Sequence, residues 1–409
     1  MVKEKEKIFT EIEHLEKEMV DALCSLIRCP AVTPRNGGTG EQAKAELIEK
    51  ILKSLKLPDP EWFFVKDDGA PGGKRPSLIV NYPGVSRERL WIVSHIDVVP
   101  EGDRKLWSHD PFEPFVKDGY VHGRGALDNG QALVASIYAL YALKKLGISP
   151  KREVILCFAA DEEMGSHFGF NQMTDRLKKD DLILVPDIGT EKGDILYIGE
   201  KGPLWLEFVV HGKQVHASLP NRGINACRVA NLLSVELDSA FHKISTDSND
   251  LFDPATSTFE PTRRFGNVAN INTVPGMERF AFDCRMLPGS DLDKVIALAR
   301  QVSEDVAKRT GTTIEVTIAN RQDPAALPSL DSPIIRLTSG AVREVLGVEP
   351  RFGGHCGATC ATPARTAGVT ALAWEQALDA TAHMPDERCK IEHMLNEAKV
   401  FAAMMLNDY

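Results

Sequence analysis

The amino-acid sequence predicts an α/β fold in which a mostly parallel sheet is interrupted by a smaller α+β domain. Short, nearly continuous apolar runs alternate with helical patterns in the first and last parts of the chain, as expected of strands buried on both faces of a sheet. After Gly202-Pro203 a separate series of strands and helices begins. We therefore expect one domain built from residues 1–203 and 323–409, with a second domain inserted over residues 204–322.

The first part of the chain begins with two helical patterns. Apolar residues recur at three- and four-residue spacing from Lys3 to Arg28, and a second helix is predicted over residues 41–55. Four apolar runs follow as predicted strands, over residues 77–81, 89–93, 153–159 and 182–185. A helix over residues 131–146, ended by Gly147, separates the second of these runs from the third.

The inserted part has its own order of elements. We predict strand, helix, strand, helix and strand over residues 204–211, 223–241, 278–286, 291–309 and 313–319. The alternating α/β pattern resumes after Gln322. The predicted elements there are helices over 333–346, 361–366 and 392–406 and a strand over 369–374.

Composition narrows the class of protein and of partner. The chain has 409 residues, of which 43% are hydrophobic and 26% charged, so it can bury a large core and is neither disordered nor fibrous. Its net charge of -10, without clustered Lys and Arg, argues against nucleic acid or an anionic membrane as partner. We expect small-molecule or short-peptide partners.

The sequence also indicates a compartment. No segment reaches the roughly 20 apolar residues that span a bilayer, and the charged start of the chain has no apolar signal core behind it. The eight cysteines are dispersed and include no CxxC pair, which suits free thiols in a reducing compartment. We therefore expect a cytoplasmic protein.

Residues that could bind metal follow several of the predicted strands. His95 and Asp97 come directly after the strand over residues 89–93, and open α/β sheets place functional groups at the carboxyl ends of their strands. Asp97 could accept the second imidazole N–H of His95 and so fix which nitrogen faces a metal. A packed or surface histidine is the alternative interpretation.

Further candidates lie at strand ends, at a helix start or in a late loop: Asp128, Glu162, Glu163, Asp187 and His383. Each alone has a structural alternative. Asp128 could cap the helix that begins at residue 131, and the adjacent Glu162 and Glu163 could be solvated on a loop. Their occurrence at successive strand ends, however, indicates a common site.

The residue types indicate a metal site. Imidazole and carboxylate ligands without thiolate suit Zn²⁺, Co²⁺ or Mn²⁺, and five or six of them exceed what one four-coordinate ion uses. Two metal ions about 3.5 to 4 Å apart would use the full set. Cys356 and Cys360 beside His355 could form half of a thiolate zinc site, but no second pair completes it, so free thiols are the preferred interpretation.

Other catalytic motifs are missing from the sequence. It contains no GxSxG nucleophile elbow, no GxxxxGK[ST] phosphate loop and no HExxH metal motif, and Gly123-Arg-Gly125 lacks the third glycine of a dinucleotide fingerprint.

A series of further motifs runs in order through the chain: Ser94-His-Ile-Asp-Val-Val-Pro100, Trp107-Ser-His-Asp-Pro-Phe112, Gly123-Arg-Gly-Ala-Leu-Asp-Asn129, Asp161-Glu-Glu-Met-Gly165, Pro186-Asp187, His216-Ala-Ser218, Asn272-Thr-Val-Pro275, Asp283-Cys-Arg285 and Ala382-His-Met-Pro-Asp-Glu387. Through these motifs the chain resembles the co-catalytic zinc aminoacylase and carboxypeptidase family, which includes acetylornithine deacetylase, succinyl-diaminopimelate desuccinylase and bacterial glutamate carboxypeptidase.

The resemblance implies a division of roles around two zinc ions, for which cobalt or manganese could substitute. By this resemblance Asp128 bridges the ions, His95 and Asp187 bind one of them, Glu163 and His383 bind the other, Glu162 is the general base and Asp97 orients His95. Two cations would acidify a bridging water, and Glu162 would take its proton and return it to the leaving amine.

The resemblance also implies that the inserted domain is a lid and dimerisation domain of a homodimer. His216 would steady the oxyanion, and Asn272 and Arg285 would contact the carboxylate end of the substrate. The alternatives are a solvated histidine, a strand-end amide and a surface salt bridge. Thr359 lies in a loop that shapes the substrate pocket in relatives.

Two departures leave the substrate open. Gly130 stands where relatives usually have lysine, and the usual Gly-Gly-Thr-Asp-Ala appears as Gly357-Ala-Thr-Cys-Ala361. We expect a dinuclear zinc hydrolase that cleaves the amide bond of an N-acyl amino acid or small peptide with a free carboxylate. A catalytically silent metal- or ligand-binding relative and a mononuclear metalloenzyme are the competing hypotheses.

Overall fold

A computed structural model describes residues 2–378 and 381–409. The chain forms two compact units. The first contains Met1–Ile198, Pro328–Gly353 and Thr359–Tyr409, and the second contains Gly199–Leu327 and Gly354–Ala358. The predicted combination of an α/β part with a smaller α+β part is confirmed.

The first unit is built on an eight-stranded sheet with the order β1-β2-β6-β3-β7-β16-β8-β15. Pairing is parallel between β6 and β3, β3 and β7, and β7 and β16, whereas β1, β2 and β8 pair antiparallel. The strands are β1 (Glu61–Lys66), β2 (Lys74–Tyr82), β3 (Arg89–His95), β6 (Glu153–Ala159), β7 (Leu182–Thr190), β8 (Ile195–Glu200), β15 (Arg351–His355) and β16 (Ala371–Gln376).

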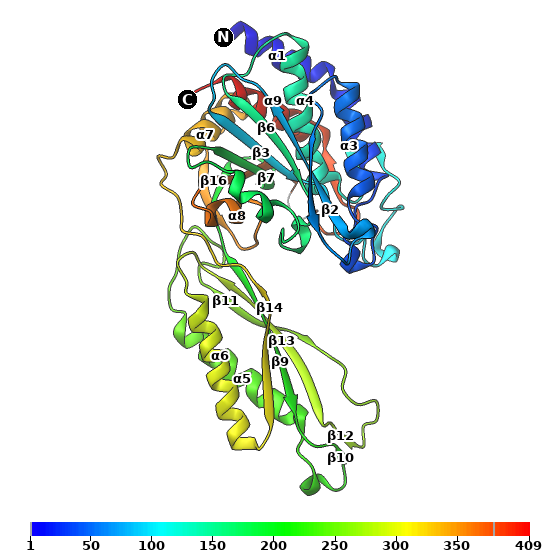
Figure 1. The fold of residues 1–409 in the computed structure, drawn as a ribbon, viewed down its shortest axis with the longest axis vertical. Coiled ribbons are helices and arrows are strands. Elements are labelled where there is room, and N and C mark those ends of the chain that lie inside the picture. The colour runs from blue at the N-terminus through cyan, green and yellow to red at the C-terminus, as the bar shows by residue number, and fades with distance from the viewer. Residues whose placement is uncertain (1, 379–380) are drawn as a thin grey trace. The chain divides into compact units, whose positions relative to one another are not determined.

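Apolar side chains on both faces of the central strands hold this sheet between layers. Along β3, Trp91 and Val93 belong to a buried cluster that also includes Ala361 and Ala364 of α8 (Ala361–Thr366). The alternate residues Leu90 and Ile92 are fully buried, and α4 (Ala132–Lys145) and α9 (Ile391–Leu406) contact the sheet and each other. Figure 1 shows the helices of this unit around the sheet. This two-sided burial explains why β3 and β6 lack polar alternation.

The remaining helices of the first unit are α1 (Val2–His14), α2 (Glu16–Ile27), α3 (Gln42–Ser54) and α7 (Pro333–Leu346). The prediction of one helix from Lys3 to Arg28 is wrong at Leu15, where the chain changes from α1 to α2. Leu15 keeps the apolar spacing because it is buried, and its N–H still bonds to the carbonyl oxygens of Glu11 and Ile12 at 3.1 Å each. The apolar stripe could therefore not reveal the break.

A small three-stranded sheet lies beside these layers. It consists of β4 (Phe115–Lys117), β5 (Tyr120–His122) and β17 (Arg388–Lys390), with β5 in the middle. Arg388 pairs with His122 across it. The sheet therefore joins the end of the chain to the segment that leads into α4, and so brings two of the motifs together.

The second unit is a four-stranded antiparallel sheet with the order β11-β13-β9-β14. Its strands are β9 (Gly202–His211), β11 (Thr258–Arg264), β13 (Met277–Met286) and β14 (Thr313–Arg321). Two helices, α5 (Ala226–Ile244) and α6 (Leu292–Thr310), contact one another in Figure 1. Phe208, Phe280 and Phe282 of the sheet share one buried core with Leu233 and Val295 of the helices.

A two-stranded ladder also belongs to the second unit. It pairs β10 (Val215–His216) with β12 (Thr273–Val274), so that His216 lies opposite Thr273. Across both units, no helix among the residues with a defined placement is long and apolar enough to cross a membrane.

Candidate metal centre

The first group of potential ligands forms where β3 ends. His95 is the last residue of β3 and is 3% exposed. Its Nε2 lies 2.8 Å from Oδ1 of Asp128 and 3.3 Å from Oδ1 of Asp187. One ligand atom from each of these residues lies within 4.8 Å of the others, so a single cation could touch all three.

A second group lies on the other side of Asp128. Nε2 of His383 lies 2.9 Å from Oδ2 of Asp128 and 3.1 Å from Oε2 of Glu163. These three residues also offer ligand atoms within 4.8 Å of one another. Asp128 therefore belongs to both groups and directs a different carboxylate oxygen to each, as a bridging ligand would.

Asp187 owes its position to an irregularity of β7. Val185 pairs with Ala373 of β16 and Gly189 pairs with Glu375, so the register between the two strands shifts around Asp187. Such bulges re-aim side chains. The prediction that Asp187 follows its strand is therefore wrong in detail, because β7 continues to Thr190 and Asp187 lies within it.

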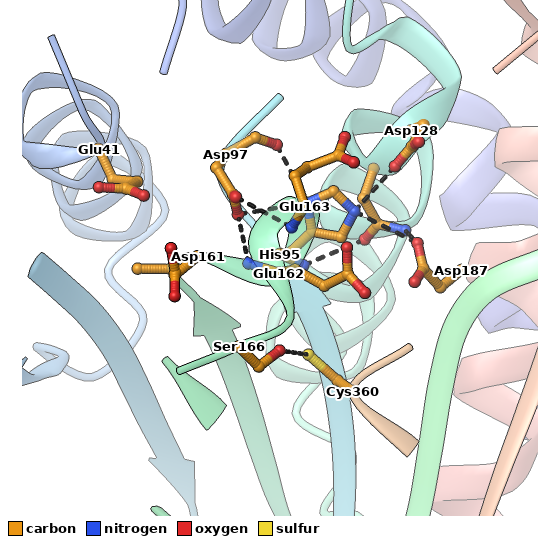
Figure 2. Close-up of polar contacts among 12 residues, drawn as sticks. Glu41, His95, Asp97, Asp128, Asp161, Glu162, Glu163, Ser166, Asp187 and Cys360 are labelled. Atoms are coloured by element: carbon orange, nitrogen blue, oxygen red, sulfur yellow. Dashed lines mark hydrogen bonds and ion pairs between the residues drawn. The ribbon is translucent and has the colours of Figure 1, made fainter. Parts of the chain in front are cut away.

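Glu162 and Glu163 occupy a short turn after β6. Asp161 has a φ of 64° and starts a 3₁₀ turn over Glu162–Met164. The Glu162 and Glu163 N–H groups each donate to a different oxygen of the Asp97 carboxylate, at 3.1 Å. Figure 2 shows the Glu162 carboxylate beside that of Asp187. The turn therefore places the Glu163 carboxylate in the second ligand group and the Glu162 carboxylate beside the first.

Asp97 is buried and acts on both the turn and the histidine. Its carboxylate accepts hydrogen bonds from the two N–H groups of the turn. Its Oδ1 also lies 3.6 Å from Nδ1 of His95. The nearer partner of that ring nitrogen is the Asp97 backbone oxygen at 3.0 Å. The structure thus directs His95 Nδ1 to the main chain of Asp97 more closely than to its side chain.

Charge crowding shifts the pKa values of the site. Burial by itself would lower the pKa of His95, but Asp187 and Asp128 raise it well above its ordinary value. Hydrogen bonds that His383 donates to the Asp128 and Glu163 carboxylates raise its pKa to about 11. Burial, followed by the charge of Asp128, raises the pKa of Glu163 to about 7. Clustered carboxylates around imidazoles favour a bound cation.

The pKa of Glu162 is also raised by its surroundings. Burial raises its pKa well above the ordinary value, and the charge of Asp187 adds to the rise. A carboxyl group with a raised pKa can hold a proton near neutral pH, as a general acid or base must.

Asn129 is part of the site although no role was predicted for it. Its Nδ2 donates to the Pro186 carbonyl oxygen at 2.6 Å and to Oδ1 of Asp187 at 3.1 Å, and its Oδ1 accepts the His95 N–H at 3.3 Å. Asn129 therefore connects the three segments that supply His95, Asp128 and Asp187. The sequence signals that could have pointed to it are its adjacency to Asp128 and its place at the end of the Gly123–Asn129 motif.

The loop before α8 is ordered by its own side chains. Thr359 is 5% exposed, and its Oγ1 accepts the Ala361 N–H at 3.0 Å. Cys360 is a buried free thiol whose sulfur lies 3.8 Å from Ser166 Oγ (Figure 2). Burial raises the pKa of Cys360 well above its ordinary value, so the sulfur is protonated. Cys356 is also free and donates to the Asp253 carbonyl oxygen at 3.1 Å.

Three predicted site residues belong to the second unit. His216 is exposed, and its Nδ1 accepts from the Ser218 backbone N–H at 3.1 Å. The Asn272 carbonyl oxygen accepts the Ala217 N–H at 2.8 Å, which places both residues at the β10–β12 ladder. Arg285 lies near the end of β13 that is remote from this ladder, and Asp283 binds its Nε at 2.7 Å and its Nη2 at 3.0 Å. Within this unit Arg285 is therefore separate from His216 and Asn272.

Sequence comparison places the chain among known proteins. The model of peptidase family M20/M25/M40 matches residues 91–407. An uncharacterized metallohydrolase of Methanocaldococcus jannaschii is 35% identical over 404 residues, which is 95% of this chain and 98% of that protein. A succinyl-diaminopimelate desuccinylase of Bradyrhizobium sp. is 28% identical over 408 residues, 95% of this chain and 99% of that protein.

Structural comparison finds the same fold at lower identity. The dipeptidase Dug1p of Saccharomyces cerevisiae has a TM-score of 0.82 at 16% identity, covering 99% of this chain and 98% of that one. A metallo-carboxypeptidase of Sulfolobus solfataricus has a TM-score of 0.77 at 19% identity, covering 95% and 98%. The family match and the 35% identical relative together show that the chain belongs to peptidase family M20/M25/M40 and is a metal-dependent hydrolase.

Proposed function

We propose that the protein uses two zinc ions to cleave the amide bond of an N-acyl amino acid or a short peptide that carries a free carboxylate. The observation that carries the proposal is the position of the Asp128 carboxylate, whose two oxygens lie in two different ligand groups. Cobalt and manganese accept the same imidazole and carboxylate ligands. Desuccinylases and dipeptidases among the similar proteins support an amide substrate.

His95, Asp128 and Asp187 would hold one ion, and Asp128, Glu163 and His383 would hold the other. When bound, two such ions acidify water and polarise a carbonyl group. The donor set fits them because it combines imidazole and carboxylate without thiolate.

Glu162 is the general base of the proposed reaction. Its carboxylate lies beside the first ligand group and has a raised pKa, caused first by burial and then by Asp187. It therefore can accept a proton from the attacking water and pass it to the leaving amine nitrogen. Asp97 supports this step because it fixes the backbone of Glu162.

The second unit would supply substrate contacts in a homodimer. The exposed His216 would donate to the oxyanion, and Asn272 beside it would bind the carboxylate end of the substrate. Arg285 could bind that carboxylate only by exchanging Asp283 for it. Thr359 would shape the pocket from the loop before α8. Sedimentation velocity at micromolar protein should show dimers, and monomers alone would contradict the proposed assembly.

The activity is tested by amine release from a panel of N-acyl amino acids and dipeptides. Chelator-stripped protein should be inactive, and protein reloaded with zinc or cobalt should cleave at least one compound in the panel. If protein confirmed to hold two metal ions per chain cleaves none of them, the proposed substrate class is wrong.

A further inference from the structure

Glu387 is a fully buried carboxylate that the proposed reaction does not use. It follows His383 by four residues and directly precedes β17. A charged side chain is costly to bury unless its charge and hydrogen-bonding capacity are matched. The contacts of the Glu387 carboxylate therefore indicate which groups it stabilises.

One oxygen of Glu387 binds the backbone around Asp128. Oε1 accepts the N–H groups of Gly125, Leu127 and Asp128 at 3.1, 3.0 and 3.1 Å. The main chain of Glu387 adds a further bond, because its carbonyl oxygen accepts the Gly123 N–H at 2.9 Å. Glu387 thus holds the segment 123–128 through four backbone donors.

This segment needs an acceptor from elsewhere in the chain. The turn over Ala126–Gln131 is not a regular helix, since Asp128 has φ -102° and ψ 99° and Asn129 has φ -121° and ψ 30°. The Leu127 and Asp128 N–H groups bond to Glu387 instead of to a carbonyl oxygen of the turn. Without that acceptor, buried N–H groups would be left unpaired.

The other oxygen of Glu387 is matched by a cation. Oε2 accepts from Nη1 of Arg124 at 2.6 Å, and both side chains are buried, at 2% and 0% exposed. Burial raises the pKa of Glu387, and the charge of Arg124 opposes this rise. The pair keeps the carboxylate oriented so that Oε1 faces the backbone.

We infer that Glu387 is a positioning residue that fixes Asp128 and His383 relative to one another and so assembles the second ligand group. Asp128 is bound by the Glu387 side chain, and His383 lies four residues before it in the same loop. Glu387 acts through these two segments, and the inference rests on the proposed metal-dependent function.

The test is cobalt binding to metal-free protein, followed by the visible absorption of bound Co²⁺ and by calorimetry. Glu387→Gln keeps the side-chain volume but replaces one acceptor oxygen with an amide N–H₂ group. We expect the weaker of the two cobalt dissociation constants to rise by about 10- to 100-fold, the usual effect of losing a group that orients metal ligands.

A double-mutant cycle separates positioning from general destabilisation. In a His383→Ala background, Glu387→Gln should raise the same dissociation constant by a smaller factor than in the wild-type protein, because one of the two ligands that it positions is already missing. Equal effects in both backgrounds, or a wild-type constant in Glu387→Gln alone, would overturn the inference. The control is Glu397→Gln, another fully buried glutamate, which should keep wild-type cobalt binding.

If Glu387→Gln does not fold, the pair Glu387→Gln with Arg124→Met leaves no unpaired buried charge and should show the same weakening. If the wild-type protein itself binds no cobalt, the proposed metal-dependent function is wrong. If the wild-type protein binds cobalt and Glu387→Gln binds it equally well, only the role of Glu387 is wrong.

Discussion

Glu162 combines burial, a neighbouring carboxylate and a raised pKa, which together suit proton transfer. We predict that Glu162→Gln lowers kcat by about 10²- to 10⁴-fold, because the amide cannot accept the proton. Metal content should stay at the wild-type value, since Glu163 remains in the second ligand group. The measurement is steady-state amine release together with metal analysis of the same sample.

A matched control for that variant lies on β6, the strand that leads into the turn of Glu162. Glu153 is at the start of β6, at the end remote from the site, and Glu153→Gln should retain wild-type kcat. Near-normal turnover by Glu162→Gln would show that another group takes the proton.

Metal binding should depend on pH through the imidazoles. In the metal-free protein the pKa of His383 is raised to about 11, so His383 holds a proton at pH 8, and the pKa of His95 is also raised. A histidine whose pKa is higher in the folded than in the unfolded protein stabilises the metal-free fold. This stabilisation is complete when the pH is below the pKa of the unfolded state, and it is lost as the pH rises through the pKa of the folded state. A cation must displace the proton of His383, so metal affinity should increase with pH.

Calorimetry in buffers with different ionisation enthalpies counts the protons released. We expect at least one proton at pH 8, from His383, and about one more at pH 6, where Glu163 also has to lose its proton. An absence of proton release at pH 8 would contradict the assignment of His383 as a ligand.

The residue types of the site follow from the sequence, but some of the contacts that position them do not. His95, Asp128, Asp187, Glu163 and His383 stand in motifs that resemble a known family, and the structure brings their ligand atoms together. Glu387 is the last residue of the Ala382–Glu387 motif, yet its role depends on a hydrogen bond from the Asp128 N–H, about 260 residues earlier in the chain. No local pattern encodes such a contact.

At the scale of elements, the close approach of β7 and β16 controls the position of Asp187. A side chain added at Gly189 would place its Cβ 1.9 Å from the Glu375 carbonyl oxygen. We predict that Gly189→Ala destabilises the first unit by about 1 to 3 kcal/mol, as overpacking typically does, and weakens metal binding because Asp187 is displaced.

Denaturant unfolding and cobalt titration of the same variant measure both effects. Gly266 is the control glycine, because a Cβ there would meet nothing within 4 Å and Gly266→Ala should behave as wild type. A Gly189→Ala protein with wild-type stability and cobalt affinity would show that the two strands can separate without affecting Asp187.

The elements that the sequence predicted well are those whose surroundings are uniform. β6 has the predicted bounds Glu153–Ala159 because every residue after Glu153 is apolar and buried. β1 was missed because the edge strand Glu61–Lys66 is half exposed and has only one neighbour in the sheet. Its apolar run, Trp62-Phe63-Phe64-Val65, is only four residues long with a charged residue at each end, and so short a run does not by itself distinguish a strand from a helix segment.

At the scale of the whole molecule, metal should stabilise one unit and not the other. Both ligand groups belong to the first unit, and the described residues of the second unit form no such group. A ligand present at about 100 times its dissociation constant adds about 2.7 kcal/mol of stability. We therefore predict that zinc raises the melting temperature of the first unit by about 5 to 10 °C.

Differential scanning calorimetry with and without chelator measures this shift. The transition of the second unit should stay at the same temperature in both samples and thus serves as an internal control. Equal shifts of both transitions, or none, would contradict a site confined to the first unit.

The order of strands in the large sheet also has a consequence for synthesis on the ribosome. β7 ends at Thr190, but its parallel neighbour β16 begins only at Ala371, about 180 residues later. At a synthesis rate of about 5 to 20 residues per second, this edge of β7 stays unpaired for about 10 to 40 s. Unpaired edges invite pairing with other chains. Nascent chains stalled before β16 should therefore require chaperones to stay out of aggregates, and they cannot complete the second ligand group, since His383 has not yet been made.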